Sequence, residues 1–294
     1  MTLLPALKSL NRGWAVCLIV LLGITANSKN LCAEGLQSGH QQMYYNVYAG
    51  GIHALEANLD MDKTKKDRFS VELYAKTYGL LGKLAPWFGT FETHGWLDKE
   101  KTIAKPELHQ SKTTWKTELE VKKYKYNKDG TFKEYSLLDN ENDGSPQPVE
   151  KELTDHSTDI LSAMLEEMMK ISVGQDCKGE SEIFDGKRRY KLIFNHKGIV
   201  DLKKSKYNVF EGKATECSIK IEPKGGKWHA KPRGWFAIQE QGREAGSMPT
   251  VWFGQVDKNE TAIPVKVRAK TSYGTFFLHL TGYESTGTKI ALKE

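Results

Sequence analysis

Hydrophobic and polar residues alternate along most of the chain after its first forty or so positions. Side chains two positions apart lie on the same face of a β-strand, so this alternation predicts strands that bury one face. The pattern predicts strands at residues 52–59, 68–77, 87–97 and 263–269. Gly50 and Gly51 precede the first of these segments and predict a turn. The chain is therefore expected to be mostly β.

Residues 113–126 have the most regular alternation and predict one long strand. The apolar residues occupy odd positions as far as Val121 and even positions from Tyr124 onward. A period-two pattern changes face only where a residue is inserted, so we expect a β-bulge near Lys122 and Lys123.

One segment departs from this period. Its apolar residues recur every three or four positions, which predicts a helix with one apolar face: Ile160, Leu161, Met164, Leu165, Met168 and Ile171. Thr154, Asp155 and Ser157 are candidate N-caps, and Gly174 can end the helix. We expect no other helix in residues 149–264. The methionine-bearing face either packs on a sheet or faces a lipid-like ligand.

The first residues have the pattern of an export signal. Lys8 and Arg12 precede an apolar stretch at residues 13–26, which is shorter than the roughly 20 residues that span a bilayer. We predict a signal peptide over residues 1–33, with cleavage after Ala33. Cleavage after Ala26 and an uncleaved anchor are the alternatives. With cleavage, no transmembrane span is expected in the mature chain.

The cysteines add a constraint. Cleavage would remove Cys17 and Cys32 and leave Cys177 and Cys217, and two cysteines in an exported chain predict one disulfide. The bridge would clamp a segment of three expected strands; two unpaired buried thiols are the alternative. A lipoprotein anchored at Cys32 is disfavoured because the bulky Leu31 precedes that cysteine.

Charge and motifs exclude several classes of function. The net charge is +6 and falls to +3 once the three cations of the export signal are removed, which is too mild to predict nucleic-acid binding. The sequence lacks the phosphate-binding loop, the HExxH and CxxC metal or redox motifs and the GxSxG motif of hydrolases. Its eight histidines are far apart. We therefore expect no cofactor, no metal site and no catalytic residues.

These elements predict a single domain, all-β dominant, over residues 34–294. We expect one curled, spiral or half-barrel antiparallel sheet of about a dozen strands that hides its edges, with one long helix packed in or against it. The pattern leaves open whether the sheet closes.

Four short segments carry a resemblance to a known family: VYAGGI at 47–52, TDILSA at 158–163, FDGKRRY at 184–190 and IPV at 263–265. In order and spacing they resemble the bacterial exported domain-of-unknown-function family 3108. The plan is also similar to periplasmic β-spiral envelope-integrity proteins and, more distantly, to half-barrel lipoprotein carriers. The resemblance implies a Gram-negative periplasmic protein with a curled sheet and a helix, and it transfers no catalytic residue.

Three hypotheses about function follow. The first is a non-enzymatic periplasmic protein that supports the cell envelope by binding an envelope component or a protein partner. The second is a periplasmic carrier of a lipid or acyl ligand, held between the sheet and the methionine-bearing helix. The third is a cell-wall or glycan hydrolase, which needs two carboxylates, or a histidine and a carboxylate, converging in a cleft.

Overall fold

The structure is a computed structural model, and it describes residues 39–228, 234–271 and 274–292. The expected cleavage position after Ala33 lies outside the described residues. Residues Glu34–Glu294 form one compact unit.

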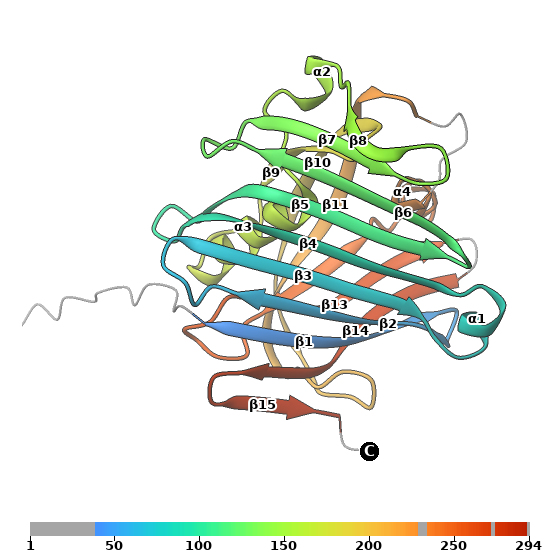
Figure 1. The fold of residues 1–294 in the computed structure, drawn as a ribbon. Helices are drawn as coiled ribbons and strands as arrows, with labels where there is room; N and C mark the ends of the chain where they lie inside the picture. Colours follow the sequence, from blue (N-terminus) through green and yellow to red (C-terminus); the bar gives the residue numbers. More distant parts are fainter. Residues whose placement is uncertain (1–38, 229–233, 272–273, 293–294) are drawn as a thin grey trace, which may run out of the picture. The chain divides into compact units, whose positions relative to one another are not determined.

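The dominant feature is one antiparallel sheet (Figure 1). Its fifteen strands in the described residues are β1 His40–Ala49, β2 Ile52–Asp62, β3 Arg68–Thr77, β4 Trp87–Asp98, β5 Ile103–Trp115, β6 Glu118–Tyr126, β7 Phe132–Leu138, β8 Asp143–Gln147, β9 Glu180–Phe184, β10 Arg188–Leu202, β11 Gly212–Gly226, β12 Thr250–Gly254, β13 Ile263–Thr271, β14 Gly274–Ser285 and β15 Thr288–Ala291. From the edge strand β8, neighbouring strands run back through the sequence to β1. β1 pairs with β14, and the order then continues from β14 back to β9 at the other edge. β15 pairs with β14.

The sheet curls but does not close by backbone hydrogen bonds: β8 and β9 are its ends. The two ends instead meet through aromatic side chains. Phe184 of β9 lies 6.0 Å from Tyr124 of β6 and 5.8 Å from Tyr135 of β7, measured between ring centroids. These rings form a small second core beside the main one. The expectation of a single curled antiparallel sheet is confirmed.

The described residues also form four helices: α1 Gly79–Leu84, α2 Lys151–Thr154, α3 Ile160–Ser172 and α4 Gly234–Glu244. α3 is the long helix predicted from the apolar spacing, and it lies against β4 and β5. Its N-cap is Asp159, whose Oδ1 accepts from the backbone N–H groups of Leu161 and Ser162. Thr154, Asp155 and Ser157 are therefore not the cap.

The C-terminal end of α3 was predicted more closely. The helix ends at Ser172, and Gly174 has a positive φ of 83° while its N–H donates to the carbonyl of Ile171. A glycine tolerates this left-handed conformation without a steric cost, which is why it marks the helix end. The expectation of no other helix in residues 149–264 was wrong, since α2 and α4 both lie there.

The expected strand at residues 113–126 was also wrong. It is a hairpin in which β5 ends at Trp115 and β6 begins at Glu118, with Lys116 at φ 57°. A two-residue turn preserves the odd–even pattern, so the alternation continued through it and concealed it. No bulge occurs near Lys122, where pairing with β5 is continuous. The register shift on β6 lies at Lys125/Tyr126, against β7.

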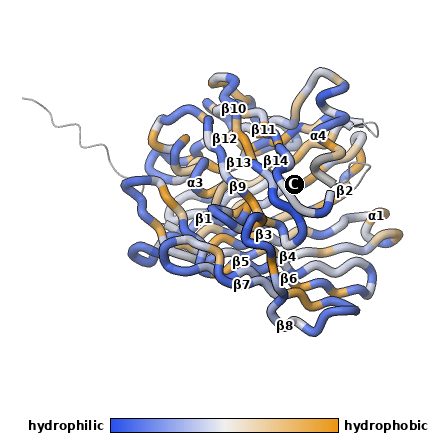
Figure 2. Tube along the Cα trace, turned by 90° about the horizontal axis from the view of Figure 1, so that it is seen from above, coloured by the Kyte–Doolittle hydropathy of each residue, from blue (hydrophilic) through white to orange (hydrophobic). Residues whose placement is uncertain are grey.

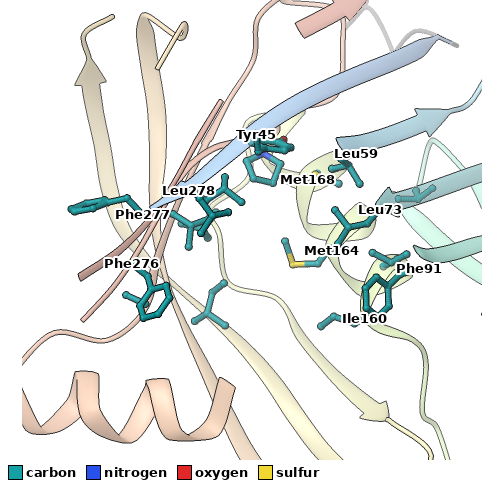
Figure 3. A pocket seen from close by; sticks show the side chains of 18 of the residues that line it. Tyr45, Leu59, Leu73, Phe91, Ile160, Met164, Met168, Phe276, Phe277 and Leu278 are labelled. Carbon is teal, nitrogen blue, oxygen red and sulfur yellow. The ribbon is translucent and has the colours of Figure 1, made fainter. Parts of the chain in front are cut away.

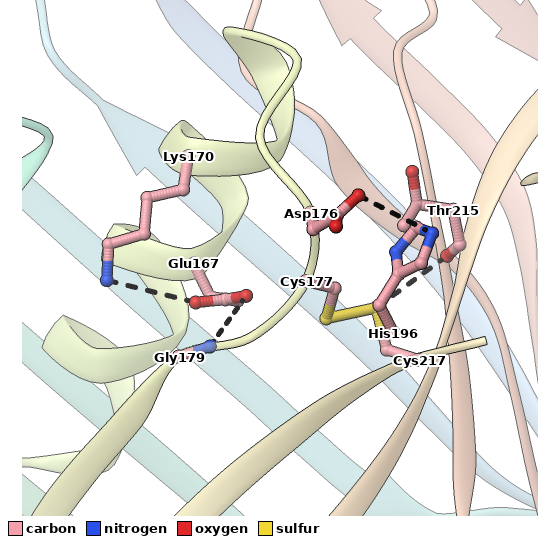
Figure 4. Close-up of a disulfide and its surroundings, with 8 residues drawn as sticks. All are labelled: Glu167, Lys170, Asp176, Cys177, Gly179, His196, Thr215 and Cys217. Carbon is pink, nitrogen blue, oxygen red and sulfur yellow. Dashed lines mark hydrogen bonds and ion pairs between the residues drawn. A yellow bond between two sulfur atoms is a disulfide. The ribbon is translucent and has the colours of Figure 1, made fainter. Parts of the chain in front are cut away.

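The disulfide between Cys177 and Cys217 is present, as expected, with their Cα atoms 6.2 Å apart (Figure 4). It ties the loop that follows α3 to the middle of β11. Beside it, Oε1 of the buried Glu167 accepts from the backbone N–H of Gly179 at 3.2 Å. The end of α3 is thus fixed to the sheet both covalently and by a buried carboxylate.

Candidate functional site

An apolar cavity of about 500 Å³ lies between the inner face of the sheet, α3 and α4. Its walls come from segments far apart in the sequence: Tyr45 and Val47 of β1, Leu59 of β2, Val71 and Leu73 of β3, Phe91 of β4, Ile160, Leu161, Met164 and Met168 of α3, Ile219 of β11, Ile238 of α4, Val251 of β12, Pro264, Val267 and Ala269 of β13, and Phe276, Phe277 and Leu278 of β14. Apart from Tyr45, every lining residue is apolar.

Helix α3 supplies one wall because of its spacing. Met164 and Met168 follow Ile160 at four-residue intervals, so the three side chains lie on one helical face and point into the cavity (Figure 3). Leu165 and Met169 are fully buried in the main core beside it. The two methionines line the cavity without filling it. A flexible thioether side chain can adapt to the shape of a ligand.

Helix α4 covers part of the cavity with Ile238. The neighbouring Gln239 anchors the helix to β11: its Oε1 accepts from the backbone N–H of Ile221 and its Nε2 donates to the carbonyl of the same residue. Sequence reasoning did not predict this wall, because the apolar residues of the segment around α4 do not recur every three or four positions. The Gln239 side chain thus makes the two backbone hydrogen bonds that a neighbouring strand would otherwise make with Ile221. Only the three-dimensional structure shows such a role for a glutamine.

The cavity has two distinguishable ends. In Figure 3, Tyr45 and Met168 lie along the upper side of the cavity, while Phe276 lies below them on the left and Ile160 below them on the right. Phe276 pairs with Ala49, the last residue of β1, and therefore lies near the ends of its strands.

Tyr45 contributes the polar atom of the lining. Its side chain is 3% exposed, and its hydroxyl has no hydrogen-bond partner among the described residues. Burial, with a smaller contribution from nearby Tyr283, raises the pKa of this hydroxyl well above its usual value. The hydroxyl therefore stays protonated, and the cavity carries no charge at this end.

Behind this end lies a buried polar network. Gln41 Nε2 donates to the carbonyl of Thr261 at 3.0 Å and to the hydroxyl of Tyr283 at 3.1 Å. The Tyr283 hydroxyl donates to Glu260, and Lys63 Nζ donates to the Thr261 hydroxyl. Burial lowers the pKa of Lys63 to about 8, and the charge of Lys99 adds to the shift. None of these side chains is among those that line the cavity.

A second polar cluster bears on the hydrolase hypothesis. His109 Nδ1 lies 3.4 Å from Asp159 Oδ1, and Thr93 Oγ1 donates to the same carboxylate oxygen at 2.8 Å. Ser162 Oγ donates to its Oδ2 at 2.6 Å. Asp159 is 1% exposed and His109 7%, and burial lowers the pKa of His109 although Asp159 opposes the shift. A histidine and a carboxylate do converge, but inside the protein, and the carboxylate serves as the cap of α3.

Sequence reasoning missed this cluster because its members lie on β4, β5 and α3. In the basic segment at residues 184–190, Arg188 pairs with Asp185 at 2.5 Å and Arg189 pairs with Glu182 at 3.1 Å. Within the described chain, no group of three or more His, Cys, Asp or Glu side chains is arranged to hold a metal ion. The described helices include none with the length and apolar character needed to cross a membrane.

Comparison with known proteins gives a family for the chain. The model of the family described as "Protein of unknown function (DUF3108)" matches residues 43–281. No curated protein matches the chain. A similar solved structure is the crystal structure of a beta-barrel-like protein of the domain of unknown function DUF1849 from Brucella abortus, with 10% identity, a TM-score of 0.47, and coverage of 85% of this chain and 99% of that one. Because the family match spans most of the chain, this protein belongs to the DUF3108 family.

Proposed function

We propose that this protein is an exported, non-enzymatic binding protein that carries a lipid or another acyl ligand in its apolar cavity. The observation that carries the proposal is the cavity itself, with a volume of about 500 Å³ and a lining that is apolar apart from one tyrosine. Small-molecule sites typically have volumes of roughly 300–1,000 Å³. Carrying an envelope lipid is a specific form of the broader role in envelope support expected from the sequence.

The chemistry of the walls selects the class of ligand. A charged or strongly polar group inside this cavity would lose its hydration and find few hydrogen bonds in return. A methylene group gains about 0.8 kcal/mol on leaving water for such a site. The ligand should therefore place its hydrocarbon chain inside the cavity and keep its polar end outside the cavity, in contact with water.

Equilibrium binding of saturated fatty acids of increasing chain length tests this proposal. With residues 34–294 as the protein, each added methylene should lower the Kd about fourfold until the cavity is full, after which the Kd should become constant. Met164→Trp should narrow the cavity and move this plateau to shorter chains. A Kd that does not depend on chain length would refute the proposal.

Export to the periplasm of a Gram-negative cell is part of the same proposal. The basic start, the apolar stretch at residues 13–26 and the bridge between Cys177 and Cys217 support it, because disulfides persist in oxidising compartments. The mass of the protein isolated from its own host should be measured under denaturing, non-reducing conditions. It should equal the mass of residues 34–294 less two hydrogens, since cleavage removes residues 1–33 and the disulfide removes two hydrogens. An intact N-terminus would contradict cleavage after Ala33.

A further inference from the structure

Six large hydrophobic residues lie exposed at the same end of strands β2, β3 and β4, on a surface that we call the α1 corner: Ile52, Tyr78, Leu80, Leu81, Leu84 and Phe88. Ile52, Leu80 and Leu84 are 70%, 70% and 71% exposed, respectively. The residues belong to adjoining segments, since α1 contacts β2 and β3 (Figure 1). The ring of Tyr78 also packs on that of His53, with 4.1 Å between centroids.

The leucines of α1 are presented to solvent by a well-anchored turn. No residue of α1 is buried. The turn is nevertheless fixed at its base, where Thr77 Oγ1 donates to the carbonyl of Ala85 at 3.2 Å and accepts from the N–H of Trp87 at 2.9 Å. Figure 2 shows hydrophobic residues at α1, which lies at the outer edge of the chain in that view. Contiguous exposed apolar surface of this kind marks a site of interaction with a protein or a membrane.

The charges around the corner favour a membrane with anionic lipids. Lys76 precedes Tyr78 in the chain and Lys83 follows it, and both side chains are exposed. Lys116, on the hairpin between β5 and β6, is exposed as well. Lys76 is paired with Glu56 at 3.4 Å. Among the described residues, no carboxylate forms an ion pair with Lys83 or Lys116. Apolar side chains flanked by lysines are typical of surfaces that bind the interface of anionic bilayers.

The α1 corner adjoins one end of the cavity. Ile52 pairs with Ala49, and Ala49 pairs with Phe276, which lines the cavity. On β4, the side chains of Trp87 and Phe91 meet over Gly89, each with an atom 3.0 Å from the position a Cβ there would occupy. Phe91 also lines the cavity. Apolar side chains thus continue from the strand ends at the corner to the cavity wall.

We propose that the α1 corner docks on the surface of an anionic lipid bilayer, with the Phe276 end of the cavity brought toward the lipid. The role of this docking rests on the proposed carrier function: a docked protein would let the ligand pass between the bilayer and the cavity along an apolar path. Leu80, Leu81 and Leu84 enter the interfacial region, and Lys83 contacts lipid phosphates.

Vesicle binding tests the docking surface. Residues 34–294 are the appropriate form, because they make one compact unit with its own core and lack the apolar stretch at residues 13–26, which would itself bind lipid. Phosphatidylglycerol-containing vesicles should bind the protein more tightly than phosphatidylcholine vesicles, and salt should weaken the binding. Leu80→Ser/Leu84→Ser should lower the partition coefficient at least about tenfold, and Lys83→Ala about fivefold.

Two controls make the outcome specific. Ile199→Ser removes a residue that is 66% exposed outside the corner, and it should leave vesicle binding unchanged. Each variant is also titrated with a soluble fatty acid. Wild-type protein that does not bind vesicles, or a double leucine variant that binds like wild type, overturns the docking proposal even if the fatty acid still binds. Corner-dependent vesicle binding without any fatty-acid binding upholds docking and overturns the carrier function.

A third outcome would also overturn docking. If the double leucine variant differs from wild type only in its mass in solution, the corner is an interface between copies of the chain or with another protein.

Discussion

At the scale of single residues, Tyr45 places a hydroxyl in the wall of an apolar cavity, where the described part of the chain offers it no hydrogen-bond partner. A buried polar group without a hydrogen bond lowers stability, at a cost of about 1–3 kcal/mol. Tyr45→Phe should therefore raise the free energy of unfolding of the unliganded protein by about 1 kcal/mol, as measured by urea denaturation. Affinity for a fatty acid should be equal or tighter, because the polar end of the ligand stays at the mouth.

Tyr126→Phe is the matched control for this prediction. The Tyr126 hydroxyl is also buried and has no partner within the described ranges, but it lies in the second core and not in the cavity. This variant should gain stability and leave fatty-acid binding unchanged. A loss of stability in Tyr45→Phe would show that its hydroxyl has a partner.

Lys63 gives a prediction about pH. Its pKa is about 8 in the folded protein against an ordinary value of 10.5, so between these values the unfolded chain binds more protons than the folded one. Stability attributable to Lys63 therefore rises with pH across that window. Relative to Lys63→Met, wild type should gain about 2–3 kcal/mol of unfolding free energy between pH 8 and 10.

Urea unfolding at several pH values measures this difference. Lys65→Met, at an exposed neighbouring position, should follow wild type at every pH. Parallel curves for wild type and Lys63→Met would contradict the argument.

Sequence reasoning was least informative at this scale. The partners of Asp159 are Thr93, His109 and Ser162, and only Ser162 is near it in the chain. Spacing predicts residues that share a helix turn or a strand face. It says nothing about which strand will lie beside which helix, so the cap of α3 and the cavity lining were beyond its reach.

At the scale of elements, α3 is the part of the site that the sequence predicted best. Its three- and four-residue spacing requires no knowledge of its neighbours. The hairpin at Trp115–Glu118 was missed because its turn contains none of the usual glycine, proline or asparagine signals and preserves the strand alternation. Short-range patterns thus fix the type of an element more securely than its ends.

The disulfide holds α3 in place at the cavity. Cys177 follows the helix and Cys217 lies in β11, and the bridge closes a loop of 40 positions. In chain-entropy terms such a bridge contributes about 4 kcal/mol. Cys177→Ala/Cys217→Ala should lose about this much unfolding free energy and bind fatty acids more weakly, because the α3 wall is less constrained.

The same loss should appear when wild type is unfolded under reducing conditions, which separates the bridge from the packing of the cysteine side chains. A loss below about 1 kcal/mol in both experiments would mean that the bridge contributes little to the fold.

At the scale of the whole compact unit, the need to hide sheet edges correctly predicted that the sheet curls. The same argument could not decide whether the two ends of the sheet pair with each other. The seam between the ends consists of the rings of Phe184, Tyr124 and Tyr135, which come from distant strands. A sheet closed by side chains, with α3 and α4 against its inner face, leaves the space that we propose holds a ligand.

The native mass of the protein isolated from its own host tests the central claim most directly. A carrier should retain its cargo, so the native species should exceed the denatured mass by that of a lipid, and Met164→Trp should reduce the fraction that carries it. A native species of the same mass as the bare chain, in wild type as in the variant, would contradict the carrier function.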